Sequence, residues 1–585
     1  MHDLVVRGGI VVDGTGGPVR TADVAVEDGL IVEVGEVDAR ARRTIDADGA
    51  VVTPGFVDIH THYDGQATWD AHLTPSCWHG VTTAILGNCG VGFAPVAPDG
   101  QQRLIDLMEG VEDIPGSALA EGIQWGWESF PDYLDALDRL PRAIDVGTHL
   151  PHAAVRAYVM GQRLHEPAHP DDLLAMATIV REALRAGALG VSTGRTAGHR
   201  DIHGDLVPGT LADDQEVAAL LQAMVDVGAG VLQVVPAGIS DEMGGDQPGA
   251  MERELAWLVA HGRRFDRPIT FLAMQRGEDT DGWRPWFQEV AEANAAGARI
   301  HPQVANRCFG VLMGHQSRMN PFQYFPTYRG LMDLPFGERI RRLGDPDIRA
   351  TILGEERTLP AEVSMDVLGR RSFENLFPLG DPLDYEPAPE ASVASIARRT
   401  GQDPWAVAYD LLLESEGREF LLFPLLNFGE GSYDGLHDMM TSPMTVQGLG
   451  DGGAHCGLVC DASMTTYMVS HWARDRSRGA KFTLEWAVKR LTGDPSALYG
   501  LHDRGLLTPG RRADLNLIDF DELGLLHPER VDDLPGGAGR LIQRSTGYLE
   551  TIVAGETVVD HGELTDARPG GLVRGGQRSM SQRRR

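Results

Sequence analysis

Residues 51–62 decide the fold of this chain. They read Val51-Val52-Thr53-Pro54-Gly55-Phe56-Val57-Asp58-Ile59-His60-Thr61-His62. The apolar run predicts a buried β-strand, and His60 and His62 come where that strand ends. Residues two apart in a strand point to the same side, so both imidazoles face one point. Such a pair is half of a metal site, although two hydrogen-bonded histidines at a strand end would show the same pattern.

The same apolar pattern recurs seven more times along the chain, separated by helical stretches. The predicted strands lie near Gly55–His62, Val81–Gly90, Ile144–Leu150, Ala188–Gly194, Gly230–Pro236, Pro268–Gln275, Ala298–Val304 and Thr445–Asp451. The expected helices include Leu173–Ala186, Asp214–Val227, Met251–His261 and Trp283–Ala296. Eight such units predict an α/β protein with a (β/α)8 TIM-like barrel, whose active site lies at the C-terminal ends of the strands.

The two ends of the chain have a different, all-β pattern. Residues 1–54 show short runs of alternating polar and apolar residues separated by Asp-Gly turns, which predicts β-strands. Residues 505–575 show a similar strand pattern. We expect these segments to join into a small β-sandwich, with residues 55–504 forming the barrel. An insertion at about 308–443 is too long for an ordinary loop and is expected to cover the mouth as a lid. Residues 576–585 are expected to be disordered.

Composition excludes several classes of partner. The net charge of −32 argues against nucleic acid, because a phosphate backbone needs a basic surface. The sequence has no apolar stretch of about eighteen residues, so no membrane span is predicted. Five scattered cysteines and the lack of a signal-like N-terminus favour the reducing cytoplasm. We expect a small-molecule substrate and a homo-oligomeric assembly.

Asp451 is the candidate that completes the histidine pair. It ends the eighth predicted strand, in Gly448-Leu449-Gly450-Asp451. A closed barrel makes its first and last strands neighbours, so Asp451 can share a metal with His60 and His62. It is also well placed to take a proton from water at such a metal. The alternative is an ordinary turn aspartate before Gly452-Gly453.

Cys89 is a further candidate ligand. It lies in Gly87-Asn88-Cys89-Gly90, at the end of the second predicted strand. A thiolate there could bind zinc, and glycines on both sides open the backbone around it. A small buried core cysteine is the alternative.

The motifs described so far resemble the amidohydrolase superfamily, and its D-aminoacylase (N-acyl-D-amino-acid deacylase) branch matches best. The resemblance rests on His60-Thr61-His62, Gly87-Asn88-Cys89-Gly90 and Asp451, and it covers nearly the whole chain. Further similar segments are 152–161, 190–195, 499–515 and 567–570. The resemblance implies a (β/α)8 barrel with a terminal β-sandwich, bound zinc, and hydrolysis of an amide.

The chain also departs from that family. The resemblance implies histidines at the ends of strands five and six, but these strands read Val231-Leu232-Gln233-Val234-Val235-Pro236 and Phe271-Leu272-Ala273-Met274-Gln275-Arg276. A lysine bridge between two metals, used by another group of such hydrolases, is impossible because the only lysines are Lys481 and Lys489. We therefore expect one zinc ion, held by His60, His62 and Asp451 with Cys89, and a missing or rebuilt second site.

Other residues are candidates for contacting substrate. They are His152, Arg195, Gln233, Gln275, His301 and His455, and His199 lies in the same predicted loop as Arg195. His301, at the end of the seventh predicted strand, or His455, just past Asp451, could touch metal or substrate. Arg195 could pair with a substrate carboxylate. Satisfied loop histidines and surface arginines are the alternatives in each case.

The function expected from these residues is metal-dependent hydrolysis of a non-peptide C–N bond. The expected substrate is an N-acyl-D-amino acid or a similar N-acyl amine. Cyclic-amide hydrolysis uses the same scaffold, usually with the lysine bridge that is absent here. Deamination normally needs the strand-five histidine. The missing histidines also motivate a catalytically inactive barrel with an assembly or binding role.

Overall fold

The computed structural model describes residues 1–239, 246–247, 249–276, 279–359 and 373–576. Eight parallel strands form its central sheet, in the order β16-β12-β11-β10-β9-β8-β7-β6. They are β6 (Phe56–Asp58), β7 (Val81–Leu86), β8 (Asp145–Pro151), β9 (Gly190–Gly194), β10 (Val231–Val235), β11 (Ile269–Leu272), β12 (Ile300–Val304) and β16 (Val446–Gln447). A parallel bridge from Thr61 to Gly452 brings the two outer strands together. The predicted barrel and its eight strands are confirmed.

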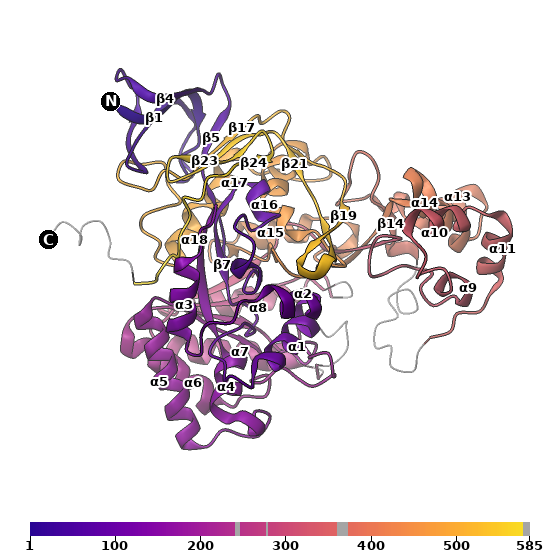
Figure 1. The fold of residues 1–585 in the computed structure, drawn as a ribbon, viewed down its shortest axis with the longest axis horizontal. Coiled ribbons are helices and arrows are strands. Elements are labelled where there is room, and N and C mark those ends of the chain that lie inside the picture. Colours follow the sequence, from indigo (N-terminus) through magenta and orange to yellow (C-terminus); the bar gives the residue numbers. More distant parts are fainter. Residues whose placement is uncertain (240–245, 248, 277–278, 360–372, 577–585) are drawn as a thin grey trace.

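The barrel strands are apolar because both of their faces are covered. Every residue of β7, β9, β10 and β11 is buried. The covering helices follow the chain between strands, in the lower part of Figure 1. They are α1 (Gln101–Glu112), α2 (Gly116–Gly122), α3 (Phe130–Arg139), α4 (His152–Met160), α5 (Pro170–Ala186), α6 (Asp214–Val227), α7 (Ala250–Arg264) and α8 (Trp283–Ala295). The four helices predicted from the sequence are among them.

Local signals fix the ends of these helices. In α6 the Asp213 side chain accepts a hydrogen bond from the Glu216 backbone N–H, and left-handed Gly228 ends the helix. In α5, Pro170 starts the first turn and Gly187 closes the last one.

Strands from both ends of the chain form one branched nine-stranded sheet. Its path is β24-β23-β22-β17-β5-β1-β2-β3, and β4 also pairs with β1. The strands are β1 (His2–Val11), β2 (Arg20–Glu27), β3 (Leu30–Gly35), β4 (Ala41–Asp46), β5 (Val51–Pro54), β17 (Leu515–Ile518), β22 (Tyr548–Val553), β23 (Glu556–Asp560) and β24 (Glu563–Leu564). Strands from the two terminal segments therefore share one sheet, at the top of Figure 1. The exact domain boundaries drawn from the sequence stay a prediction.

The two predicted Asp-Gly turns have different outcomes. Asp28 and Gly29 form a two-residue turn between β2 and β3, both at positive φ, as predicted. The hairpin expected around Asp13-Gly14 is also present, because β1 and β2 pair antiparallel, but its loop is longer, since β1 ends at Val11 and β2 begins at Arg20. Inside this loop the Asp13 carboxylate accepts a hydrogen bond from the Thr15 N–H.

The insertion between β12 and β16 has a small core of its own. Its main elements are β13 (Phe309–Gly314), α9 (Pro326–Arg329), α10 (Phe336–Leu343), α11 (Pro346–Gly354), β14 (Phe377–Pro378), α13 (Val393–Thr400), α14 (Pro404–Gly417), β15 (Phe420–Leu426) and α15 (Asp434–Thr441). Phe322, Tyr328 and Tyr409 pack at its centre. Its helices α9 to α14 project sideways from the barrel in Figure 1. The predicted lid function stays a prediction.

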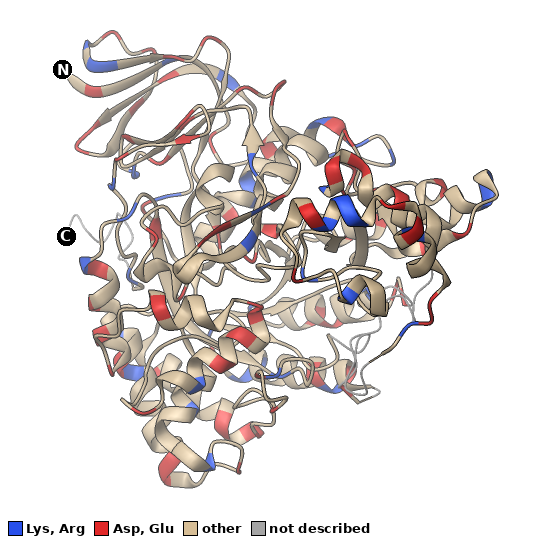
Figure 2. Cartoon of the chain, turned by 45° about the vertical axis from the view of Figure 1, so that its right-hand side comes forward, with Lys and Arg blue, Asp and Glu red and all other residues tan. Residues whose placement is uncertain are grey.

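The remaining α-helices and β-strands of the described chain lie between β16 and β22. They are α16 (Met464–Tyr467), α17 (Leu484–Leu491), α18 (Gly493–Leu498), β18 (Gly524–Leu525), β19 (Glu529–Leu534), β20 (Ala538–Ile542) and β21 (Ser545–Thr546). None of the helices in the described part of the chain combines the length and apolar character needed to cross a bilayer. The acidic residues are distributed over the whole ribbon rather than gathered in one patch (Figure 2).

Candidate metal centre

The closure of the barrel brings His60, His62 and Asp451 together. The His62 N–H donates to the Gly452 carbonyl at 2.8 Å, and the Asp451 N–H donates to the His60 carbonyl at 3.0 Å. These backbone bonds continue β6 and β16 as neighbours beyond their last assigned residues. Asp451 Oδ1 consequently lies 3.5 Å from His60 Nε2 and 3.8 Å from His62 Nε2.

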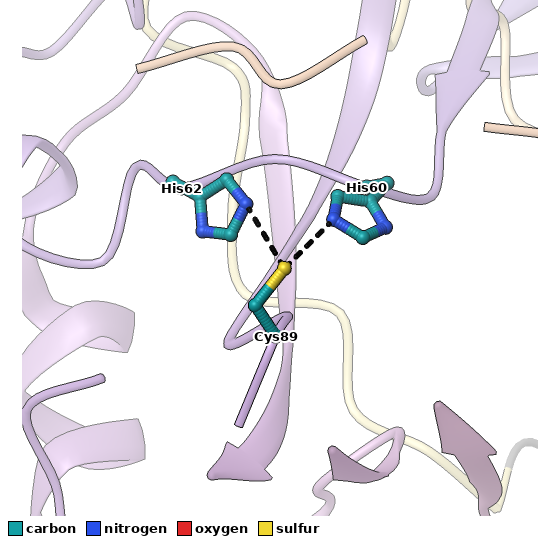
Figure 3. Close-up of side chains that lie close together, drawn as sticks. All are labelled: His60, His62 and Cys89. Atoms are coloured by element: carbon teal, nitrogen blue, oxygen red, sulfur yellow. Dashed lines mark hydrogen bonds between the residues drawn. The ribbon is translucent and has the colours of Figure 1, made fainter. Parts of the chain in front are cut away.

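The Cys89 thiol meets the same two imidazoles (Figure 3). Its Sγ lies 3.4 Å from His60 Nε2 and 3.8 Å from His62 Nε2, and all three side chains are buried. Ligands around a tetrahedral zinc ion lie about 3.3–3.6 Å apart, given bonds of about 2.0–2.1 Å to nitrogen and about 2.3 Å to sulfur. The donor set and its spacing therefore fit a divalent cation such as zinc.

Gln303 holds the His60 imidazole in the matching tautomer, and Glu112 lies beside the His62 imidazole. Gln303 Oε1 lies 2.9 Å from His60 Nδ1, while its amide Nε2 donates to Thr270 Oγ1 at 2.9 Å. Glu112 Oε1 lies 3.4 Å from His62 Nδ1, without a hydrogen bond between the two atoms. A proton on His60 Nδ1, donated to Gln303 Oε1, leaves the Nε2 lone pair of His60 free to bind a cation.

Sequence reasoning missed both residues that lie beside these imidazoles. Gln303 occupies the C-terminal half of β12, a position that could have marked it as a site residue. Glu112 is the last residue of α1, in the loop region after β7, and no local motif distinguishes it.

The electrostatics of the cluster favour a bound cation. Burial lowers the pKa of His60 to about 4 and that of His62 well below its ordinary value, so both rings are neutral. Burial, followed by Asp461 and Asp58, raises the pKa of Asp451. Among the described residues, Asp451 and Glu112 make no ion pair with arginine or lysine. A buried carboxylate without a cationic partner is costly, and a divalent ion would remove that cost.

The backbone at the site is held in uncommon conformations. Cys89 has φ 57°, Asp451 has φ 45° and His455 has φ 50°, all in the left-handed region. Such conformations cost free energy for residues with a Cβ and gather at functional sites. A Cβ on Gly90 would lie 2.6 Å from the Gly194 backbone nitrogen, so the Cys89 loop needs glycine there.

A cavity of about 760 Å³ opens above the cluster. His60, His62, Cys89 and Asp451 lie in its lining together with Glu112, His199 and His455. His455 Nε2 is 3.8 Å from Glu112 Oε2. The structure therefore brings His455, a predicted substrate contact, to the mouth, and it adds His199.

His152 and Arg195 are absent from the described lining of this cavity. His152 Nε2 is bound to Glu216 Oε1 and its Nδ1 to Thr193 Oγ1, both at 2.9 Å. The Arg195 guanidinium pairs with Glu254 at 2.5 Å and lies 4.3 Å from the centre of the Trp257 ring. Both side chains are occupied by internal contacts, which explains why they do not reach the cavity.

Gln233, Gln275 and His301 are likewise absent from the described lining of this cavity. Gln233 Oε1 accepts the Cys89 N–H at 2.9 Å, so it supports the thiol loop from β10. Gln275 Oε1 accepts the Gly429 N–H and its amide donates to the Thr280 carbonyl. His301 was expected at a strand's C-terminal end, which is wrong. It is the second residue of β12 and lines a different pocket, with Pro268, Arg299 and Thr445, at the opposite end of the barrel.

Comparisons with known proteins agree with the fold. A family model described as the amidohydrolase family matches residues 43–559. The N-acyl-D-glutamate deacylase of Alcaligenes xylosoxydans xylosoxydans is 33% identical over 539 residues, covering 89% of this chain and 88% of that protein.

Two solved structures share the architecture. One is the N-acyl-D-glutamate deacylase of Bordetella bronchiseptica complexed with zinc and a phosphonate inhibitor, at 23% identity and TM-score 0.64, covering 98% of this chain and 99% of that one. The other is a D-aminoacylase with a binuclear metal centre, described by one-metal activation and second-metal attenuation. It has 23% identity and TM-score 0.65, covering 98% of this chain and 100% of that one.

Proposed function

Since this chain belongs to the amidohydrolase family, we propose that it removes the acyl group from an N-acyl-D-amino acid or a similar N-acyl amine. The observation that carries the proposal is the convergence of two imidazole Nε2 atoms, a thiol and a carboxylate at the bottom of a cavity. The relative at 33% identity, an N-acyl-D-glutamate deacylase, supports the choice of substrate class.

We propose a single zinc ion held by His60, His62 and Cys89, with Asp451 at its open side. The donor set fits zinc, and the deacylase from Bordetella bronchiseptica was solved with zinc. One ion is favoured because the described ends of β10 and β11 carry Val235 and Met274 instead of histidine. The D-aminoacylase described by one-metal activation supports the sufficiency of one ion in this fold.

The reaction adds water across the amide bond. A bound divalent cation supplies Lewis acidity, which polarises the carbonyl and makes water more acidic. Asp451 accepts a proton from the attacking water and passes it to the leaving nitrogen. A C–O bond forms and the C–N bond breaks, giving a carboxylic acid and an amine. Gln303 keeps His60 oriented throughout, and Glu112 lies beside His62.

We also propose a cellular compartment and an assembly state for the enzyme. All five cysteines are free and buried, which supports a reducing compartment such as the cytoplasm. Assembly into a homo-oligomer is proposed as well.

The test is amine release from N-acetyl-D-amino acids by the purified full chain, before and after chelation. We expect activity that is lost on chelation and restored by zinc, and that is absent in His60→Ala. His561→Ala, which changes an exposed histidine of the terminal sheet region, serves as the matched control and keeps activity. A chain that holds less than about a tenth of an equivalent of metal and hydrolyses no amide would favour the inactive-barrel alternative.

A further inference from the structure

The cavity above the metal centre has two chemically different faces. The polar groups of the lining come from the end of α1, the loop after β9 and the His455 segment, which also contribute Val111, Ile202 and Val459. Glu112 faces His455 there, and Asp113 pairs with Arg318, whose side chain is largely exposed at the rim. Arg318 is the sole arginine among the described lining residues.

A second part of the lining is apolar and begins at the strands that lack histidine. Val235 ends β10, and Leu272 and Met274 lie at and beyond the end of β11. These positions lie on the strands whose ends the family resemblance associates with a second metal. Here they present aliphatic side chains to the cavity instead.

The insertion extends this apolar face. Phe309 of β13 is paired with Leu426 of β15, and both line the cavity. The Asn427 N–H donates to the Gln275 carbonyl at 2.8 Å, and Asn427 Oδ1 accepts the Gln275 N–H at 2.7 Å. These bonds join β15 to the segment after β11, so Leu426 and Met274 belong to one continuous wall.

We propose that this apolar face binds an aliphatic acyl chain longer than acetyl, so that the substrate is an N-acyl amino acid with a medium-length fatty acyl group. The inference rests on the proposed function and specifies its substrate class. Hydrolysis of such a compound gives a fatty acid and an amino acid, with water supplying the oxygen and the proton.

The two faces match the two arms of such a substrate. The amino-acid arm carries a carboxylate, which would be costly to bury against Val235, Met274 and Leu426. The polar face with His199, His455 and Arg318 suits that arm, which leaves the acyl arm for the apolar wall. The cavity of about 760 Å³ is much larger than an acetyl group requires and lies within the range of about 300–1,000 Å³ usual for larger ligands.

The test is a series of acyl chains on one D-amino acid: acetyl, butanoyl, hexanoyl and octanoyl. Each added methylene is expected to raise kcat/KM about two- to fourfold while the wall is being filled. A flat or falling kcat/KM along the series would overturn the inference. The Met274→Gln variant should lower the octanoyl-to-acetyl ratio of kcat/KM by about tenfold, because it places an amide in the wall. Leu174→Gln, at an exposed position on α5, is the matched control and should keep the wild-type ratio.

Calorimetry with free octanoate and acetate gives a readout that does not need turnover. Octanoate should bind the zinc-loaded protein at least about tenfold more tightly than acetate, and Met274→Gln should reduce this difference. Hydrolysis without any length preference, together with equal binding of both acids, would overturn this inference and leave the proposed function intact. Tight octanoate binding without hydrolysis of any acyl compound would overturn the proposed function.

Discussion

Two groups of buried carboxylates in this barrel have opposite surroundings. Glu216, on α6, accepts hydrogen bonds from His152 and from the Arg156 guanidinium. Burial alone would raise its pKa, but these partners and their charges lower it to about 2. Asp451 and Glu112, at the metal centre, face other acids and neutral histidines, and burial raises the pKa of each.

Glu386 is a second buried carboxylate that has its own cationic partners. Glu386 is bound by the Arg476 guanidinium at 3.0 and 3.1 Å and by His471 at 2.9 Å. Burial is again outweighed by these partners, which lower its pKa to about 2. A buried carboxylate that pairs with an arginine of the chain stabilises the fold. Buried carboxylates without such a partner indicate a site where an external cation binds.

The largest expected effect is at Asp451. Asp451→Asn removes the proton acceptor but keeps the size of the side chain, so kcat/KM should fall by at least about 10²–10⁴-fold. Metal analysis and circular dichroism of the variant should show retained zinc and fold. Wild-type turnover by this variant would remove Asp451 from the mechanism.

Removing the charge of Glu216, a carboxylate with its own arginine, should lower the stability of the fold rather than the catalytic activity. Glu216→Gln leaves the buried Arg156 charge uncompensated, so the free energy of unfolding should fall by about 3–5 kcal/mol. Asp226→Asn, on the same helix α6 but in an exposed pair with Arg181, is the matched control and should leave the free energy of unfolding nearly unchanged. Denaturant unfolding measures both, and equal losses would contradict the distinction drawn here.

Glu112 differs from Glu216 because its carboxylate faces a histidine, His62, rather than an arginine. Glu112→Ala should weaken zinc binding by about 10–100-fold, as loss of a carboxylate that orients a ligand does. Glu112→Gln keeps an acceptor oxygen for His62 Nδ1 and should lose less. Chelator competition gives the affinities, with Asp106→Asn on the same helix as control. Identical losses in the Ala and Gln variants would point to direct ligation by Glu112.

The smallest effect concerns pH. Because the folded-state pKa of Glu216 lies at about 2, below its ordinary value of 4.5, its pairing stabilises the protein above pH 4.5. This stabilisation is lost as pH falls from about 4.5 towards about 2. The difference in Tm between wild type and Glu216→Gln should therefore be full at pH 7 and shrink below pH 4.5. A constant difference across that range would show that the charge of Glu216 is not the cause.

Much of the fold was predictable because its signals are local. The barrel strands are short apolar runs, and His60, His62, Cys89 and Asp451 each follow such a run directly. Residue type and strand position were enough to predict that these side chains converge. The site assignments themselves stay predictions until metal binding is measured.

The rest depended on contacts between distant segments. His152 follows β8 as His60 follows β6, but Glu216, 64 residues further along, occupies its ring nitrogen. Glu112 reaches His62 from the end of a helix with no motif of its own. The apolar face could not be predicted from the sequence either. It forms only where the hydrogen bonds of Asn427 bring Leu426 of the insertion into the same wall as Met274.

The most direct measurement is a zinc-edge anomalous difference map from crystals of the full chain grown with excess zinc. We expect one strong peak between His60 Nε2, His62 Nε2 and Cys89 Sγ, at about 2.0–2.3 Å from each atom, with Asp451 beside it. Well-ordered side chains turned away from one another, with no peak among them, would contradict the metal centre and the hydrolase proposal with it.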